Sequence, residues 1–483
     1  MAVLVALSAC LLSIGGIFDP AEDALTAWRA HTLTREPTGE TVIVEIDARS
    51  LAELRSWPWP RRYHAEAVRK LHRSGASIIA FDVDFSARSD SGDGEFGAAI
   101  RDAGHVILPI FEQRSSSRSD DRNFVSSRPD AAFRDAWVGG VNIFPDDDGV
   151  VRDYPAATFV DGAIQPSIAT LVAEKHGLGD RSFQPDWAIY ADRIPRVSFV
   201  DVMKGRVSAE TFTGKRVLIG ATAIELGDRY AVPRYGVLPG VIIQALAAES
   251  LLQGRAIQRS GLAVTIAGIF LVALLLRPRA LAAPGRYAAL AAFLTGAALV
   301  VPLLAQRQYA IALVSAAWLF TVLAAVTAQI AVEARRRLRL RAEQDTDSGL
   351  PNRAVLEKKL NDDGFSSVLV TAAIERFDAI RDGIGFDATN QMIRNAAELV
   401  GESSGGPVYR ISPDVLAWVM AAGDDVEVEL RLNRLQSLFR APVTTTAGPV
   451  DVSFTLGLAR NDGSETGMLL IERALSAVRT ARS

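Results

Sequence analysis

Cysteine is almost absent from this sequence. Cys10 is the only one among 483 residues, which excludes an intramolecular disulfide and any metal centre made of several thiolates. An excess of either charge is also lacking, because 52 basic and 56 acidic side chains leave a formal net charge of -4. Spread over this length, that charge gives no sign of nucleic-acid binding, and we expect no nucleic-acid partner.

The length and composition predict several folding units. A chain of 483 residues exceeds what one hydrophobic core usually supports, so two or three units are expected. Hydrophobic residues make up 49% of the chain, and the mean hydropathy is +0.16. That value is high for a soluble protein and low for one that lies entirely in a membrane, which predicts a minority of strongly apolar segments.

Four apolar stretches are long enough to consider as membrane-spanning helices. They are residues 2–18, 261–276, 287–304 and 311–332. The first is short and lacks flanking basic residues, so we expect its natural start to lie upstream. The second needs its flanks to cross about 30 Å of hydrocarbon. The last three are close together and predict a compact bundle in a lipid bilayer.

Cys10 ends the tetrapeptide Leu7-Ser8-Ala9-Cys10, which has the shape of a bacterial lipoprotein cleavage site. A secretory signal needs a basic start and an apolar stretch before such a site, and the sequence has neither. An unmodified thiol in a membrane helix is therefore favoured over lipidation.

The arginines beside the apolar stretches predict the orientation of the chain, because cytoplasmic loops are rich in Lys and Arg. Arg277, Arg279 and Arg286 mark the loop after the second stretch as cytoplasmic, and Arg335, Arg336, Arg337, Arg339 and Arg341 follow the fourth. We therefore predict a multi-pass protein of a bacterial inner membrane. Its expected parts are a span at 1–18, a periplasmic domain at 19–258, three spans at 259–332, a helical linker at 333–344 and a cytoplasmic domain at 345–483.

The predicted periplasmic region has the pattern of an α/β domain. Buried-type strands are expected at residues 42–47, 77–82, 105–109 and 217–220, with helices at 61–73 and 239–252. Strands that alternate with helices of this length favour a parallel sheet with crossover helices.

Short motifs follow one another through this region. They are Val44-Glu45-Ile46-Asp47, Trp57-Pro58-Trp59-Pro60-Arg61, Ala80-Phe81-Asp82-Val83-Asp84-Phe85, Asp148-Gly149-Val150-Val151-Arg152 and Val217-Leu218-Ile219-Gly220-Ala221-Thr222, followed by Asp228. In this order they resemble the bacterial CHASE sensor domain of the second type. The resemblance implies an extracytoplasmic ligand whose identity the sequence does not give.

Several polar residues of these motifs are candidates for ligand contact: Asp47, Arg61, Asp82, Asp84 and Asp228. Asp47 and Asp82 each close a strand, and ligands favour the carboxyl ends of parallel strands. Asp82 and Asp84 are expected on one strand face, because side chains alternate with a period of two. The alternative is that these aspartates cap helices and turns. Trp57 and Trp59 are expected to form an aromatic plug over the core.

A recognisable motif opens the predicted cytoplasmic domain. Residues 345–353 have the sequence Asp-Thr-Asp-Ser-Gly-Leu-Pro-Asn-Arg, and Ile374-Glu375-Arg376-Phe377, Ser453-Phe454-Thr455-Leu456-Gly457-Leu458 and Glu472-Arg473-Ala474-Leu475 follow in order. Residues 345–483 thereby resemble the GGDEF family of diguanylate cyclases and their relatives. The pattern predicts an α/β unit with a helix from Arg353, strands at 368–373 and 450–458, a helix at 387–399 and a hairpin at 409–420.

The positions that carry the chemistry of that family are altered here. Synthesis of cyclic di-GMP needs divalent metal held mainly by carboxylates. Ala373 stands where the family has a metal-binding aspartate, and the Gly-Gly-Asp-Glu-Phe turn has become Ser412-Pro413-Asp414-Val415-Leu416. Pro413 fixes φ and removes an amide donor where the family has glycine. We therefore expect no catalytic residue, no cofactor and no metal. Asp414 is the one surviving metal candidate, and Mg²⁺ and GTP are expected only with residual nucleotide binding.

Guanine and product recognition are altered as well. Arg381 and Asn390 stand at the family's guanine-binding Asn and Asp, and Ser403 and Gly406 stand at the Arg and Asp of its inhibitory motif. Arg479 keeps the positive charge of a lysine late in the last helix, and it is the candidate for a residual phosphate contact.

These observations predict a membrane-bound, homodimeric sensor and regulator in cyclic-di-GMP signalling, whose inactive GGDEF domain relays an extracytoplasmic cue. Residues 331–344 contain no Gly or Pro, so we expect them to continue the fourth span as a helix. A phosphodiesterase domain or protein is the expected partner. Three alternatives stay open: a membrane cyclic-di-GMP phosphodiesterase, if an EAL domain follows this chain; a residual cyclase with unusual metal ligation; and a purely structural membrane protein.

Overall fold

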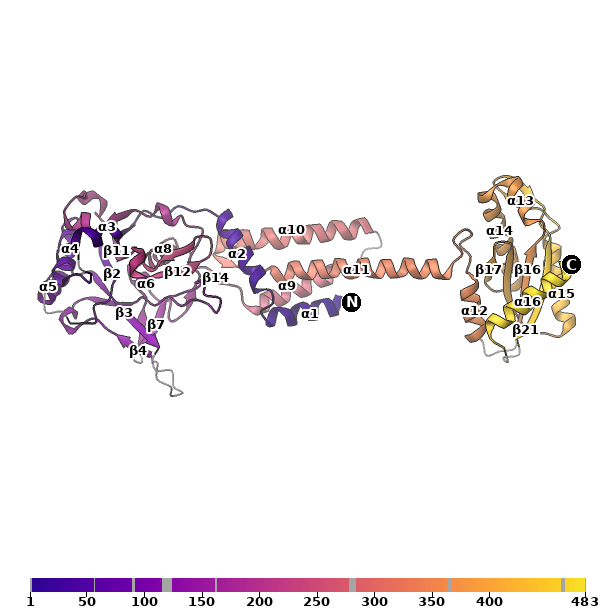
Figure 1. The fold of residues 1–483 in the computed structure, drawn as a ribbon, viewed down its shortest axis with the longest axis horizontal. Helices are drawn as coiled ribbons and strands as arrows, with labels where there is room; N and C mark the ends of the chain where they lie inside the picture. Colours follow the sequence, from indigo (N-terminus) through magenta and orange to yellow (C-terminus); the bar gives the residue numbers. More distant parts are fainter. Residues whose placement is uncertain are drawn as a thin grey trace. The chain divides into compact units, whose positions relative to one another are not determined.

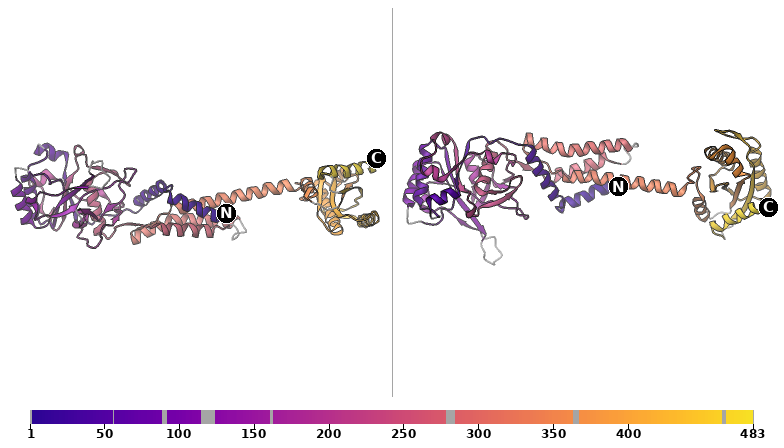
Figure 2. Two further views of the ribbon diagram at one scale, coloured as in Figure 1. Left: turned by 90° about the horizontal axis from the view of Figure 1, so that it is seen from below. Right: turned by 45° about the horizontal axis from the view of Figure 1, so that its top comes forward.

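The computed structural model describes residues 2–55, 57–88, 92–114, 124–160, 163–277, 284–362, 367–461 and 465–482. The chain forms two compact units, Met1–Ala328 and Gln329–Ser483. Figures 1 and 2 show the elements of each unit. Each unit is described by itself below.

The first unit holds the mixed α/β domain and the apolar helices. Its helices are α1 (Ala2–Ile14), α2 (Asp19–Thr32), α3 (Ala48–Leu54), α4 (Arg61–Arg73), α5 (Asp93–Ala103), α6 (Ile168–Val172), α7 (Phe199–Met203), α8 (Gly240–Leu252), α9 (Leu262–Leu275), α10 (Pro284–Tyr309) and the first part of α11 (Ala316–Glu343). Its strands are β1 (Thr41–Ile46), β2 (Ile78–Asp82), β3 (Val106–Arg114), β4 (Phe124–Ser127), β5 (Trp137–Gly140), β6 (Tyr154–Pro155), β7 (Ala157–Val160), β8 (Ala163–Pro166), β9 (Ser182–Phe183), β10 (Arg196–Ser198), β11 (Arg216–Ala221), β12 (Arg229–Val232), β13 (Gly236–Pro239), β14 (Gln258–Arg259) and β15 (Ile311–Ala312).

A parallel sheet forms the centre of the α/β domain, as the alternation of strands and helices predicts. Its order is β10-β1-β11-β2-β3, with β5 parallel to β3 and β4 antiparallel to it. Both faces are covered, and the centres of β1, β2 and β11 are accordingly apolar on both faces. Ile43 and Ile78 face a core with α6 and α8, whereas Val42 and Ile79 face a core with α4, α5 and α7.

Helix α8 is the most deeply buried helix element of the domain. Every residue from Gly240 to Leu251 is buried, and Figure 1 shows the helix against the sheet. Gly220 permits this packing, because a Cβ there would lie 2.6 Å from the Cβ of Val241. Beyond the C-terminal end of α8, Arg255 pairs with buried Asp186 at 2.9 Å.

Aromatic rings fill the core between α4 and the sheet. The ring of His64 lies 5.1 Å from that of Phe85 and 5.8 Å from that of Phe199. Trp59 is buried and stacks on Phe199 with centroids 4.8 Å apart, and Trp57 meets Trp59 edge-on at 4.9 Å. The expected aromatic plug is therefore present.

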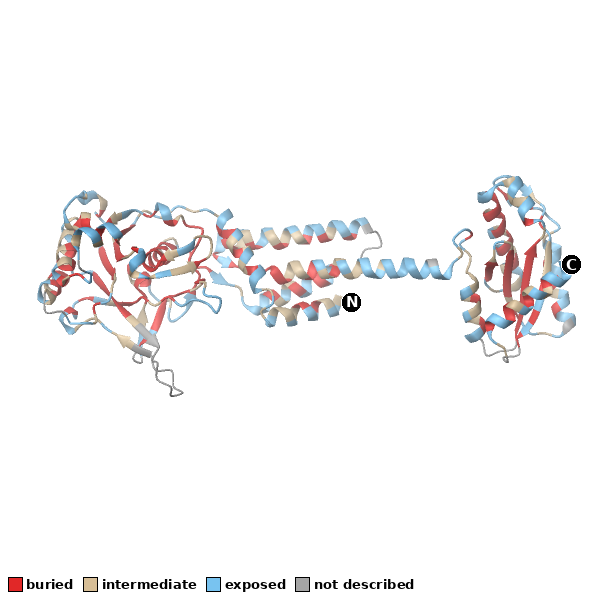
Figure 3. Ribbon diagram, viewed as in Figure 1, coloured by how far each residue is buried: buried red, intermediate tan, exposed pale blue. Residues whose placement is uncertain are grey.

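The apolar helices differ in length from the four predicted spans. Among the described residues, Gly285–Tyr309 and Ala316–Leu340 are long and apolar enough to cross a membrane, and a third span exists only if α1 and α2, bent by 80° at their junction, count as one. Helix α9 has only 14 residues. Large apolar residues of α1, α9, α10 and α11 are exposed, and Figure 3 shows the exposed positions of these helices in pale blue. Arg279 lies outside the described residues.

The predicted start of the fourth span is wrong. Ile311 and Ala312 form β15, a short ladder parallel to Gln258–Arg259, and the helix begins only at Ala316. Apolar composition alone does not distinguish a short strand from the first turn of a helix. Once begun, α11 continues as one helix to Glu343, as the lack of Gly and Pro in its second half predicts.

The second unit is an antiparallel sheet with helices on both faces. After α11 it consists of α12 (Arg353–Asp362), β16 (Ser367–Ile374), α13 (Phe377–Ile384), α14 (Phe386–Ser404), β17 (Val408–Ser412), β18 (Val415–Ala421), α15 (Asp425–Leu438), β19 (Val443–Thr445), β20 (Gly448–Val450), β21 (Phe454–Asn461) and α16 (Gly467–Arg482). The sheet order is β17-β18-β16-β21. Helices α14 and α15 cover one face, and α12 and α16 cover the other.

The single strand predicted at residues 450–458 is two strands. Val450 ends β20, which pairs only with β19, and β21 starts at Phe454. Between them Val452 is buried, and the carbonyl of Ser453 accepts a hydrogen bond from the Glu375 amide at 2.9 Å. The sequence is suited to one strand, but its first part pairs with β19 and its second part pairs with β16, so the strand is interrupted.

We predict that His64 makes the α/β domain of the first unit sensitive to acid. Burial, and then the nearby Arg61 charge, lower the pKa of His64 to about 3. Between that value and the ordinary 6.5, the unfolded chain binds a proton that the folded chain excludes. The free energy of unfolding should therefore fall as pH drops below 6.5, by up to about 1.4 kcal/mol per pH unit. Replacing His64 by leucine should abolish this part of the pH dependence of the free energy of unfolding.

The measurement is a thermal melt of the purified full chain in nanodiscs at pH 7.5 and pH 4.5, followed by tryptophan fluorescence. The difference between the two melting temperatures should be smaller for His64→Leu than for the wild type. His176→Leu, at an exposed position of the same domain, is the matched control. An equal pH difference in wild type and His64→Leu would contradict the prediction.

Candidate functional site

Asp47 acts as a helix cap in the structure. It follows β1 and its carboxylate accepts hydrogen bonds from the Ser50 amide at 2.8 Å and from the Ser198 hydroxyl at 2.9 Å. These bonds satisfy a free amide in the first turn of α3. The capping alternative therefore describes Asp47.

Arg61 and Asp84 lie together on the α4 side of the sheet. The Arg61 guanidinium donates to the carbonyls of Asp84, at 3.4 Å, and Ala87, at 3.1 Å, and stands 4.5 Å from the ring centre of Phe85. The Asp84 carboxylate accepts from the Ser86 amide at 2.8 Å. Both side chains hold the loop that follows β2. The expectation that Asp82 and Asp84 share a strand face is wrong, because β2 ends at Asp82.

Asp82 and Asp228 come together on the opposite side of the sheet, at the start of α8. Asp82 is paired across the sheet with Gly220. A Cβ on Gly220 would lie 3.1 Å from the Cβ of Asp82, and a Cβ on Gly240 would lie 2.3 Å from Oδ2 of Asp228. Glycines at both positions therefore leave room for two carboxyl groups beside the first turn of α8.

The two carboxyl groups affect each other. Burial, and then the charge of Asp228, raise the pKa of Asp82 well above its ordinary value. Burial also raises the pKa of Asp228, although hydrogen bonds from the Tyr230 hydroxyl and the Gly240 amide oppose this. Burial and the two carboxylates raise the pKa of Tyr230 to about 12. Adjacent carboxyl groups that resist ionisation in this way hold a proton more readily than isolated ones.

The five sensor candidates therefore do not form one site. Asp47 caps α3, Arg61 and Asp84 hold a loop, and only Asp82 and Asp228 meet as a pair of titratable groups. Tyr230 is a member of this cluster that the sequence analysis did not identify.

In the second unit, the altered turn lies between β17 and β18. Ala373 is buried at the end of β16, opposite Val415 in β18 and Thr455 in β21. Val415 is itself buried in the core with α12 and α16. A methyl and an isopropyl group at these places offer no oxygen to a cation.

The remaining acidic groups at this end of the sheet face an arginine. Arg482, in the last turn of α16, donates to Glu375 Oε1 at 3.0 Å, to Asp414 Oδ2 at 3.4 Å and to the carbonyl of Ile374 at 2.8 Å. The Ser412 hydroxyl donates to Asp414 Oδ1 at 2.8 Å. The Thr455 hydroxyl, and then Arg482, hold the pKa of Glu375 below its ordinary value. A guanidinium thus neutralises the carboxylates that a divalent cation would need.

A second arginine holds the turn from the inside. Arg410 is buried and donates to the Pro413 carbonyl at 2.8 Å, to Asp345 at 2.8 Å and to the Asn390 amide oxygen at 3.1 Å. Asn390, placed by sequence at a guanine-binding position, is thereby used in an internal contact. A polar cavity of about 290 Å³ lies beside this group, lined by Asp345, Asp347, Asn352, Arg353, Ala354, Arg410, Ile411, Ser412 and Pro413.

Arg479 does not contact the altered turn. It is exposed and stands 3.9 Å from Glu472. Arg482, one turn further along α16, makes the contacts with Glu375 and Asp414 instead. Arg381 is bound to Asp378 at 2.8 Å. In this unit, Arg410 and Arg482 are residues that the sequence analysis missed.

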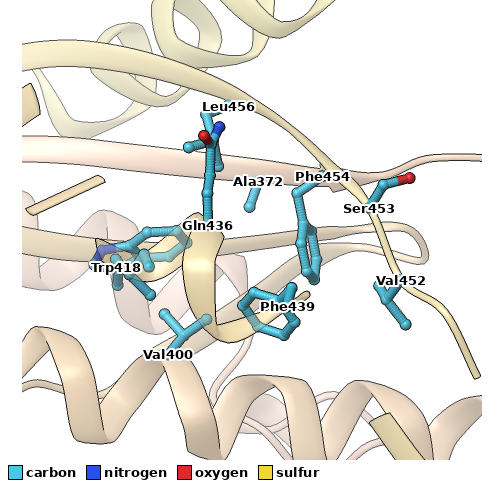
Figure 4. A pocket seen from close by; sticks show the side chains of 10 residues that line it. Ala372, Val400, Trp418, Gln436, Phe439, Val452, Ser453, Phe454 and Leu456 are labelled. Atoms are coloured by element: carbon cyan, nitrogen blue, oxygen red, sulfur yellow. The ribbon is translucent and has the colours of Figure 1, made fainter. Parts of the chain in front are cut away.

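An apolar cavity of about 220 Å³ lies on the other face of β16 (Figure 4). Ala372, Trp418, Phe439 and Phe454 contribute to its walls, together with residues of α15. Ala372 belongs to the core with α14 and α15, whereas Ala373 belongs to the core with α12 and α16. This cavity offers few groups that bind phosphate.

The residues present do not fit the divalent cation that the GGDEF resemblance implies. Among the described residues, no three His, Cys, Asp or Glu side chains lie close enough together to hold a metal ion. Asp414, the surviving candidate, is paired with Arg482. Oxygen ligands in sufficient number are what Mg²⁺ requires, and this end of the sheet supplies a cationic side chain instead.

Comparison with protein families identifies both parts of the chain. Residues 2–276 match the CHASE2 domain, and residues 342–483 match the GGDEF domain of diguanylate cyclases. The chain therefore belongs to the CHASE2 family, and its CHASE2 domain is followed by apolar helices and a GGDEF domain. Both resemblances seen in the sequence are confirmed. No curated protein matches the chain.

Several solved structures are similar to part of the chain. A diguanylate cyclase/phosphodiesterase from Caldicellulosiruptor saccharolyticus is 20% identical, covering 30% of this chain and 90% of its own, with a TM-score of 0.28. The GGDEF domain of FimX from Pseudomonas aeruginosa is 16% identical, with 29% and 94% covered and a TM-score of 0.27. The coiled coil and GGDEF domain of DgcB from Caulobacter crescentus is 20% identical, with 33% and 92% covered and a TM-score of 0.29. The family assignment rests on the matched family ranges and not on these structures.

We predict that the Asp82–Asp228 pair destabilises the CHASE2 domain at neutral pH. Because the pKa of each group is raised, the folded chain keeps protons that the unfolded chain releases above about pH 3.8. The free energy of unfolding should therefore fall as pH rises from that value through the raised pKa. Asp82→Asn keeps the size of the side chain and removes the ionisation, so it should raise the melting temperature at pH 7.5 more than at pH 4.5.

Asp180→Asn, at an exposed position of the same domain, is the matched control and should change neither value. Melting curves of the full chain in nanodiscs at both pH values provide the measurement. A lower melting temperature for Asp82→Asn at pH 7.5 would show that the carboxylate stabilises the fold and would refute the prediction.

Proposed function

We propose that this chain is a membrane-bound sensor and regulator in cyclic-di-GMP signalling whose GGDEF domain is catalytically inactive. The CHASE2 domain followed by a GGDEF domain supports the signalling role. The contacts of Arg482 with Glu375, Asp414 and the Ile374 carbonyl are the observation that carries the inactivity. Ala373 and Val415 beside them supply no oxygen ligand, and the paired carboxylates offer little free negative charge to the divalent cation that would hold a triphosphate.

The proposed location is a bacterial inner membrane, with the CHASE2 domain in the periplasm and the GGDEF domain in the cytoplasm. Two helices long enough to span support the membrane part. The arginines that follow residue 334 support the orientation, because such clusters stay on the cytoplasmic side. A homodimer, an extracytoplasmic ligand and a phosphodiesterase domain or protein as partner complete the proposal.

The first test is direct. The purified full chain with GTP and Mg²⁺ or Mn²⁺ should form no cyclic di-GMP, because Ala373 and Val415 provide no metal ligand. Product is measured by chromatography, with an active diguanylate cyclase as positive control. Sustained product that scales with the amount of protein would show a residual cyclase and refute the proposed inactivity.

A second test concerns Arg482. Removing its guanidinium leaves Glu375 and Asp414 without their counter-charge, so Arg482→Ala should make the melting temperature of the GGDEF domain rise with millimolar Mg²⁺, in the full chain. The wild type should show little dependence on Mg²⁺. Because the three side chains are each about one-third exposed, the loss of stability without Mg²⁺ should be small, on the order of 1 kcal/mol or less.

Arg479→Ala is the matched control, since Arg479 lies on the same helix, is exposed, and stands 3.9 Å from Glu472. It should behave as the wild type does. An equal response to Mg²⁺ in Arg479→Ala and Arg482→Ala would show that Arg482 does not take the place of a cation.

A further inference from the structure

Helix α2 belongs to the residues that match CHASE2, and it contacts both the α/β part of that domain and the start of α11. It turns away from α1 by 80° and carries the acidic residues Asp19, Glu22 and Asp23 in its first turns. Glu22 and Asp23 are adjacent in sequence and therefore project in directions about 100° apart. The two carboxylates have entirely different partners.

Glu22 binds the first turn of α11. Its Oε2 accepts hydrogen bonds from the amides of Ser315, at 2.8 Å, and Ala316, at 2.9 Å. The first amides of a helix have no partner within the helix, and a negative charge near them is favourable. Glu22 thus caps a helix that begins almost 300 positions later in the chain.

Arg29 completes this contact. It donates to Glu22 Oε1 at 2.7 Å and to the carbonyl of Leu313 at 3.2 Å. The side chains of Arg29 and Glu22 are only 2% and 4% exposed. Removing one partner of a buried ion pair is strongly unfavourable, because the other charge is left without compensation. The pair therefore fastens α2 to the beginning of α11.

Asp23 binds the CHASE2 domain on the other side of α2. Its Oδ2 accepts a hydrogen bond from Arg152 at 2.7 Å, and its Oδ1 lies 3.5 Å from Arg259. Arg152 also binds Asp146 and Asp148, at 2.8 Å and 2.5 Å. It ends the Asp148–Arg152 motif that was singled out in the sequence, so a loop of the sensor domain holds α2 directly.

The end of α10 is held separately. Arg255, which follows α8, donates to the carbonyls of Gln306 and Arg307 at 2.6 Å and 2.9 Å. β14, which precedes α9, pairs with β15, which follows α10, so the two ends of the α9–α10 segment are held together. Arg255 therefore holds the end of α10, whereas Glu22 binds the backbone amides of Ser315 and Ala316, where α11 begins.

We propose that α2 transmits changes of the CHASE2 domain to α11, through Arg152 and Asp23 on one side and Glu22 and Arg29 on the other. Arg152 and Glu22 are positioning residues in this scheme. α11 is the helix that continues toward the GGDEF domain, so its first turn is where a signal from the sensor enters that helix. The inference rests on the proposed sensor role and specifies how that role is carried out.

The test is amide hydrogen exchange in the full chain in nanodiscs, measured by mass spectrometry on peptides that cover residues 315–322. Arg152→Ala touches no residue of α11, yet it should make this segment exchange at least about fivefold faster, because the first turn opens more often. Arg152→Lys, which keeps the positive charge, should restore most of the protection. Arg193→Ala removes an exposed ion pair with Glu36 and is the matched control without effect.

The decisive comparison uses Glu22→Gln, which keeps the shape of the side chain and removes its charge. This variant should itself raise exchange at residues 315–322, and adding Arg152→Ala should raise it no further, because the connection is already broken. Asp23→Asn should reproduce the effect of Arg152→Ala if the arginine variant folds poorly.

Two results would overturn the proposal. One is unchanged exchange of residues 315–322 in Arg152→Ala and in Asp23→Asn. The other is additive increases when Glu22→Gln and Arg152→Ala are combined, which would mean that Glu22 is only a local cap. The experiment uses neither a cue nor a cyclic-di-GMP measurement, so its failure is distinct from a failure of the proposed signalling role.

Discussion

The packing of α8 against the parallel sheet is the constraint on which the CHASE2 domain depends. A helix buried along almost its whole length has no free face, so each neighbouring element must fit it. Gly220 lets Val241 of α8 approach the sheet beside Asp82, and Gly240 leaves room for the Asp228 carboxyl group. At the other end Glu249 binds the amide and the hydroxyl of Thr38, just before β1. One helix thus fixes both the acidic pair and the strand that opens the sheet.

Much of this domain is predictable from the sequence, because its central strands are buried on both faces. The centres of β1, β2 and β11 are short apolar runs, at residues 42–44, 78–81 and 217–219, with few alternatives. The two-residue strands β6, β9, β14 and β15 are not predictable, since their pairing depends on segments far away in the chain. β15 shows the difficulty: Ile311 and Ala312 have the composition of a membrane helix, and only their hydrogen bonds to residues 258–260 make them a strand.

The residues of the candidate sites also fall into two groups, those that the sequence reveals and those that only the fold reveals. Ala373, Pro413 and Val415 are visible in the sequence, because each replaces a residue whose chemistry is known. Arg482 is not visible, because its importance comes from the fold, which brings the last turn of α16 to a turn 68 positions earlier. A basic residue one helical turn beyond Arg479 was the only available signal. Asp82 and Asp228 were both identified, but their pairing beside the first turn of α8 comes from the fold, which places Asp82 next to Gly220 and Asp228 next to Gly240.

In the proposed role, the two units have different functions: the first senses and the second receives the signal. In the GGDEF domain the partly exposed Arg482 balances the charges of Glu375 and Asp414 at the altered end of the sheet. In the proposed role this domain does not report on GTP through those carboxylates, and its input arrives through the chain itself. The helix that enters the unit is α11, and the first amides of α11 are bound to a buried glutamate on α2, which a loop of the sensor domain holds on its other side.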